Sequence, residues 1–145
     1  MTAAAQILLG SALLTFCALV HVGMVAVMVP LLSRAADRLQ HKGVRLNILA
    51  LTASSVFLLL FAHTVQVWSW AAAFLALGAF ADFPTSFYFA TATYTTLGYG
   101  DLLLGDGLRI FGTFAAITGL LTFGISTAFL MGLIVRLLPD LNDGA

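Results

Sequence analysis

The sequence predicts an all-α membrane protein with three transmembrane helices, plus a short re-entrant helix and an extended segment between the second and the third. The chain is 61% hydrophobic and only 8% charged, whereas about a quarter of the residues in a typical soluble domain are charged. The charges are also segregated, because none lies within residues 1–33, 46–81 or 110–135. Each of these gaps is longer than the roughly 20 apolar residues that cross a hydrocarbon core as a helix.

We place the three spans near residues 6–31, 47–75 and 108–137. The first could be mistaken for a secretory signal peptide, but it lacks a basic start, its apolar run is too long and no small-residue cleavage site is well placed. We expect it to be retained as a helix. The single cysteine, Cys17, lies in this span and cannot form an intrachain disulfide.

The loop charges predict the orientation. The first connection carries four basic residues against one acid, and the stretch between the second and third spans carries three acids against Arg109. Because cytoplasmic loops hold an excess of Lys and Arg, we predict a multi-pass protein of the cell membrane. Its N-terminus lies outside, residues 82–107 are external and the C-terminus is cytoplasmic.

Residues 82–107 form neither a clean span nor a plain loop. Asp82-Phe83-Pro84 is typical of a helix start, with proline in the first turn and an acid at the positive end of the helix dipole. An aromatic-rich helix of about three turns follows, too short to span a bilayer, and glycines stand at positions 98 and 100. Irregular backbone at membrane depth is tolerated only where it is buried in protein or lines a water-filled path. The order therefore predicts an ion path.

Residues 95–101, Thr-Thr-Leu-Gly-Tyr-Gly-Asp, resemble the selectivity filter of the potassium-channel superfamily, with leucine where the usual form has valine. The resemblance covers residues 47–137 and is similar to the pore of small bacterial channels with two helices per subunit. It implies an extra helix and basic loop at 1–46, a pore domain at 47–138 (outer helix, pore helix, selectivity filter, inner helix) and a short cytoplasmic tail at 139–145. The implied function is passive conduction of potassium ions, with no enzyme activity.

In such a filter, backbone carbonyls replace the hydration shell of the ion. Pointing successive carbonyls the same way needs backbone angles that side chains resist, which explains the two glycines. The resemblance assigns K+ to carbonyls within residues 96–99 and to one hydroxyl, and it implies a homotetramer because each chain supplies one strand. The predicted ion-binding residues are Thr96, whose hydroxyl also contributes, Leu97, Gly98, Tyr99 and Gly100.

Three residues are expected to support the filter: Thr95 at the end of the pore helix, Tyr88 and Asp101. Several bacterial relatives carry a glutamate where this chain has Ala92, and a tryptophan where it has Tyr88. We hypothesise that the Tyr88 hydroxyl bonds to Asp101. The ring of Tyr99 is expected to turn away from the axis into the pore-helix aromatics.

The third span should be the inner helix. Gly119 falls where the family has its gating glycine, counted back from Phe123-Gly124; a hinge and simple close packing both remain open. The same alignment places Leu120, Phe123 and Thr127 along a central cavity, and Met131 and Val135 near a cytoplasmic constriction.

The first span carries no charge, so it is no voltage sensor. The basic residues after it recur at helical spacing and either anchor the cytoplasmic side or bind anionic lipids of the bilayer; they are Arg34, Arg38, Lys42 and Arg45. His21 and His63 lie near the middle of their spans, as pH sensors or as neutral groups bonded between helices.

Several functions are disfavoured. The net charge of zero argues against a nucleic-acid partner, and no nucleophile stands with a base as an enzyme would require. A nonselective cation channel and a non-conducting accessory subunit are the alternatives. Retention of every usual filter position except the valine argues against both.

Overall fold

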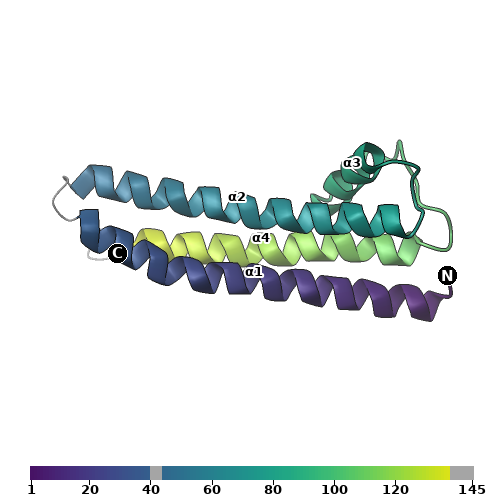
Figure 1. Cartoon of the computed structure of the whole chain (residues 1–145), viewed down its shortest axis with the longest axis horizontal. Coiled ribbons are helices and arrows are strands. Elements are labelled where there is room, and N and C mark those ends of the chain that lie inside the picture. The colour runs from purple at the N-terminus through teal and green to yellow at the C-terminus, as the bar shows by residue number, and fades with distance from the viewer. Residues whose placement is uncertain (40–43, 138–145) are drawn as a thin grey trace, which may run out of the picture.

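The chain forms four helices, with no β-strand within residues 1–39 and 44–137, the ranges that the computed structural model describes. They are α1 (Ala3–Leu39), α2 (Val44–Ala76), α3 (Phe83–Tyr94) and α4 (Arg109–Leu137). The helices α1, α2 and α4 run side by side, and the short α3 lies at one end of the bundle (Figure 1). Each long helix contains a stretch long and apolar enough to cross a membrane: Ala3–Leu32, Ile48–Ala76 and Arg109–Val135. The predicted fold class is confirmed.

The main difference from the sequence prediction is the length of α1. This helix continues through Pro30 to Leu39, beyond the predicted end at residue 31. Arg34 and Arg38 therefore belong to its last turns rather than to a loop, and Arg45 lies in the first turn of α2. Lys42 and the tail 139–145 are outside the described residues.

Different segments of the chain lie at the two ends of the bundle. The N-terminus and the connections on either side of α3 lie at one end, and the end of α1 and the start of α2 lie at the other (Figure 1). A Cβ added to Gly107 would stand 2.8 Å from the Met1 nitrogen, so the N-terminus touches the segment that leads into α4. The candidate filter and the N-terminus therefore share one end of the bundle.

The helix α1 packs against both α2 and α4. The Gln6 side-chain oxygen accepts hydrogen bonds from the backbone N–H groups of Ile110 (3.0 Å) and Phe111 (3.3 Å). These N–H groups open α4 and have no partner within their own helix. Close by, a Cβ on Gly10 would meet the Phe114 ring at 2.5 Å. The first helix therefore caps and contacts the inner helix.

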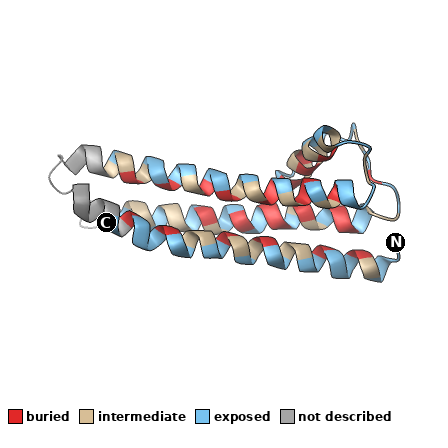
Figure 2. Ribbon diagram, viewed as in Figure 1, coloured by how far each residue is buried: buried red, intermediate tan, exposed pale blue. Residues whose placement is uncertain are grey.

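Buried residues lie on the sides of the long helices that face one another, and exposed residues cover the outward sides (Figure 2). Near α3 the core is aromatic: Trp70 and Phe74 of α2 pack on Phe111 of α4, with ring centroids 5.2 and 5.7 Å apart. A second, aliphatic cluster lies toward the other end and contains Met28, Leu32, Leu51 and Leu59. The helix α3 packs against this aromatic cluster.

Candidate selectivity filter

The start of α3 is capped as predicted. The Asp82 carboxylate accepts hydrogen bonds from the Thr85 backbone N–H (2.8 Å) and hydroxyl (3.0 Å), and Pro84 lies in the first turn. The bond from the Thr85 N–H, followed by that from its hydroxyl, holds the pKa of Asp82 below its ordinary value. The charged cap fixes the point at which the chain re-enters the bundle.

Aromatic side chains hold α3 against α2. Phe83 and Phe87 contact the Trp68 ring, at centroid distances of 5.3 and 6.0 Å. Phe89 meets Phe74 edge-on at 5.1 Å. Offset and edge-on pairs of this kind add stability beyond the apolar area that they bury. The short helix is thus rigidly attached, although it is too short to be stable alone.

The C-terminal end of α3 leads directly into the filter segment through a Schellman motif. The Thr96 N–H bonds to the Thr93 carbonyl (3.0 Å), and the Leu97 N–H bonds to the Ala92 carbonyl (2.9 Å). Gly98 N–H also reaches the Ala92 carbonyl, at 3.1 Å. The first backbone groups of the filter segment therefore satisfy the free carbonyls at the end of the pore helix.

Backbone dihedral angles alternate in sign along the filter segment. Thr96, Gly98 and Gly100 have positive φ angles of 59°, 50° and 77°, while Leu97 and Tyr99 between them do not. A short segment in which φ alternates in sign can turn successive N–H groups to one side, and hence the carbonyls to the other. Thr96 is the one non-glycine residue with positive φ in the described part of the chain. The sequence analysis expected unusual backbone angles at the two glycines, and it named Thr96 as an ion ligand without expecting its positive φ.

The contact hypothesised for the filter aspartate is present. The Tyr88 hydroxyl donates a hydrogen bond of 2.7 Å to Asp101 Oδ2. This bond raises the pKa of Tyr88 above its ordinary value, because the carboxylate retains the phenolic proton. The end of the filter segment is thereby tied to the middle of α3.

The side chains of the filter itself are open within one subunit. Tyr99 is 70% exposed and Leu97 is 55% exposed. Tyr99 makes no ring contact with the aromatics of its own α3 among the described residues, which differs from the expected packing. The filter segment is therefore held by its backbone and by Asp101 rather than by these two side chains.

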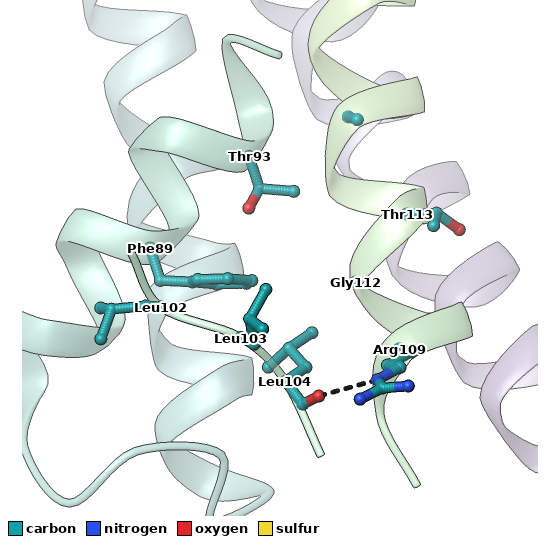
Figure 3. A pocket seen from close by; sticks show the side chains of 9 residues that line it. Phe89, Thr93, Leu102, Leu103, Leu104, Arg109, Gly112 and Thr113 are labelled. Atoms are coloured by element: carbon teal, nitrogen blue, oxygen red, sulfur yellow. Dashed lines mark hydrogen bonds between the residues drawn. The ribbon is translucent and has the colours of Figure 1, made fainter. Parts of the chain in front are cut away.

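Beyond the filter, a groove of about 550 Å³ separates α3 from the start of α4. Figure 3 shows Phe89, Leu103 and Leu104 gathered between the two helices, with the Arg109 Nε donating to the Leu104 carbonyl at 3.1 Å. Leu104 lies directly against Gly112, where a Cβ would collide with its side chain. The returning chain is thus fixed to α4 just after it leaves the filter.

The inner helix meets the pore helix at Gly119. A Cβ at this position would collide with the Tyr94 carbonyl oxygen, so the glycine permits the contact between α4 and the end of α3. This geometry supports the close-packing interpretation of Gly119 and leaves the hinge untested. The residues predicted to line the cavity and constriction are all exposed in one subunit: Leu120, Phe123, Thr127, Met131 and Val135.

The remaining predicted residues are the four basic residues and the two histidines. Arg34 is exposed at the end away from the filter, and the side chains of Arg38, Lys42 and Arg45 are outside the described part of the structure. His21 and His63 meet in mid-bundle, where each ring contacts the Ser126 hydroxyl. Interhelical bonding of both histidines, one of the two interpretations left open, is therefore observed.

A comparison with protein-family models matches residues 48–136 to the ion channel family, as a pore module of the two-transmembrane potassium-channel type. The chain belongs to this family. The match covers most of α2, all of α3, the filter segment and nearly all of α4, and it leaves α1 outside. Neither the curated proteins nor the solved structures gave a match to the chain. The protein is thus an ion channel subunit with several membrane-spanning helices.

Proposed function

We propose that this chain is a potassium-selective channel subunit that conducts K+ passively, as a homotetramer, through the filter at residues 95–101. The observation that carries the proposal is the alternation of positive and negative φ from Thr96 to Gly100, directly after a re-entrant helix. Such a backbone presents a row of carbonyl oxygens on one side, which is what replaces the hydration shell of K+.

The ions would bind at the carbonyls of Thr96, Leu97, Gly98 and Tyr99. Threonine at positive φ is costly, because a branched side chain disfavours this region, and glycine would suit the C′ position of the Schellman motif better. A hydroxyl that contributes an ion ligand explains why threonine stands there. The C-terminal end of α3 carries the negative end of the helix dipole, which favours a cation just below the filter.

The surroundings of the filter support an assembly of four chains. One chain supplies one row of carbonyls, and a ring of them is needed to enclose an ion. The exposed Tyr99 and Leu97, together with the exposed apolar stripe of α4, are surfaces that neighbouring subunits and the central cavity would cover. In this arrangement Leu120, Phe123 and Thr127 line the cavity, and Met131 and Val135 form the constriction.

Two further assignments belong to the same proposal. The end of the bundle that holds the filter faces the outside, as the positive-inside bias predicts. The basic residues at the other end, including the exposed Arg34, contact anionic lipid headgroups at the cytoplasmic surface. Loss of channel activity in neutral bilayers would support the lipid assignment, and equal activity in neutral and anionic bilayers would contradict it.

Reconstitution tests the central claim. Purified protein in liposomes with a K+ gradient should give a K+ flux that barium blocks, and the reversal potential in mixed K+ and Na+ should follow the K+ gradient. A reversal potential indifferent to the exchange of K+ for Na+ would indicate a nonselective cation channel. No flux from a correctly assembled tetramer would indicate an accessory subunit. Chemical crosslinking in the same liposomes measures the tetramer independently of conduction.

A further inference from the structure

Five polar side chains in the middle of the bundle close a ring of hydrogen bonds. His21 Nε2 lies 3.1 Å from Ser126 Oγ, which lies 3.0 Å from His63 Nε2. His63 Nδ1 lies 2.8 Å from Tyr94 Oη, and this hydroxyl lies 3.0 Å from Gln66 Oε1. Gln66 Nε2 closes the ring at 2.7 Å from His21 Nδ1.

The orientation of the Gln66 amide determines which atom donates in each hydrogen bond of the ring. Its nitrogen faces His21 Nδ1, which must therefore accept, so that His21 carries its proton on Nε2 and donates to Ser126. The Ser126 hydroxyl then donates to His63 Nε2, and His63 carries its proton on Nδ1 and donates to Tyr94. Tyr94 donates to the Gln66 oxygen. Each link holds one hydrogen, and both histidines are neutral, in opposite tautomers.

The ring joins all four helices at the base of the filter. It takes His21 from α1, His63 and Gln66 from α2, Tyr94 from α3 and Ser126 from α4. Tyr94 is the last residue of α3, and its hydroxyl also contacts Thr122 of α4 at 2.8 Å. The ring thus ties the end of the pore helix to both long pore helices and to the extra first helix.

Among the residues that the structure describes, no charged side chain lies near the ring to balance a cation. The helices contribute no charged residue within 1–33, 46–76 or 110–135. Besides the ring members, the titratable group beside it is Cys17 on α1, buried in the same apolar cluster as Tyr94. His21 is fully buried, while the His63 ring stacks on the half-exposed Phe123, with centroids 4.6 Å apart.

We propose that this ring is a proton-binding site through which acid weakens conduction. One further proton on either histidine leaves two hydrogens facing each other on one link until the Ser126 hydroxyl or the Gln66 amide turns, so the present direction of the ring is lost. The added charge has no partner in an apolar surrounding, which is unfavourable unless water enters or the helices move. The same charge, close behind the proposed cavity wall at Phe123, opposes a cation below the filter. Protons reach His63 from the cavity past Phe123.

The first test measures the protonation states of the two ring histidines and requires no substitution. Solid-state NMR of protein labelled with 15N-histidine, in liposomes at about pH 7.5, should show one buried histidine as the Nε2–H tautomer and another as the Nδ1–H tautomer. One of the two signals should convert to imidazolium on acidification to about pH 5, in the range where histidine titrates, while the second ring, with its centroid 5.0 Å away, stays neutral because two like charges repel at that distance. Identical tautomers, or two neutral rings at the acidic end, would overturn the proposal. This measurement does not depend on ion selectivity.

The second test measures K+ flux in the same liposomes, and it rests on the proposed channel function. Flux should fall on acidification from about pH 7.5 to about pH 5 by a factor within the roughly 5- to 150-fold range of typical coupling between sites. The double variant His21→Gln with His63→Gln leaves no histidine in the ring and should lose this pH response, whereas the control His41→Gln, outside the described residues, should keep it. Flux with no pH response, or a response lost in His41→Gln instead, would refute the proton site. No flux at any pH would refute the channel function and leave the NMR result to decide the ring.

Discussion

The filter segment and the polar ring lie next to each other in the bundle, yet they are built in opposite ways. The filter is shaped by backbone: residues 92–98 bond among themselves, and three positive φ angles set the direction of the carbonyls. Its side chains at 97 and 99 are largely exposed. The ring is shaped by side chains from four helices, and its members are mostly buried. The candidate filter is thus a local structure, whereas the ring depends on contacts between helices that are far apart in the sequence.

The largest expected effect comes from a side chain on the filter backbone. Gly98→Ala places an L-residue at φ +50°, which costs about 1–2 kcal/mol, and it should abolish the preference for K+ over Na+ in liposome flux. Gly78→Ala is the matched control, since φ is +68° there and an added Cβ meets nothing within 4 Å in either case. The control should retain selectivity. Equal losses in both variants would show that general strain, not filter geometry, is responsible.

The second largest effect is expected at the contact between α4 and the end of α3. Gly119→Ala forces a methyl group against the Tyr94 carbonyl and should lower the free energy of unfolding by about 1–3 kcal/mol, as overpacking does. Gly124→Ala meets nothing within 4 Å and should be nearly neutral. Thermal denaturation of the reconstituted protein measures both. If Gly119→Ala kept wild-type stability and changed only gating, the hinge interpretation would replace close packing.

Opening the ring without adding charge should lower the free energy of unfolding by a similar amount. Tyr94→Phe removes the hydroxyl that serves His63, Gln66 and Thr122, and unsatisfied buried polar groups cost about 1–3 kcal/mol. Ser54→Ala is the control, because its exposed hydroxyl bonds only to the Ala50 carbonyl of the same helix. Melting temperature should fall in the first variant alone. An unchanged melting temperature would mean that water replaces the hydroxyl and that the ring does not fix the pore helix.

The smallest expected effect is at the exposed end of the filter. Tyr88→Phe removes the bond to Asp101 and should shorten the time for which single channels stay conducting, leaving selectivity unchanged. Asp101→Asn keeps an acceptor and should be milder. Because the bond raises the pKa of Tyr88, its stabilisation is present below about pH 10 and is lost only as pH rises through the higher folded-state value. Single-channel recordings that show the same open times in Tyr88→Phe would remove Asp101 from the support of the filter.

Much of the fold could be predicted because its determinants are local or compositional. The charge-free stretches predict the three long helices, and Asp82 with Pro84 predicts the start of α3. The Tyr88–Asp101 bond was also predictable, since both residues belong to one short segment and the usual partner is replaced by Ala92. The length of α1 was not predicted. The predicted span ended at residue 31, whereas helix α1 continues past Pro30 and carries Arg34 on its last turns.

The spans, the re-entrant helix and the position of the candidate filter can be inferred from the sequence, because apolar length, helix capping and glycine are properties of neighbouring residues. The contacts of α1 become visible only in the folded chain. Gln6 reaches the N-terminus of α4 more than a hundred positions away, and His21 and Ser126 are similarly distant. No periodicity encodes such pairs, since they depend on which helix faces meet. The positive φ of Thr96 also required the structure, because threonine adopts it only where the Schellman motif and the filter impose it together.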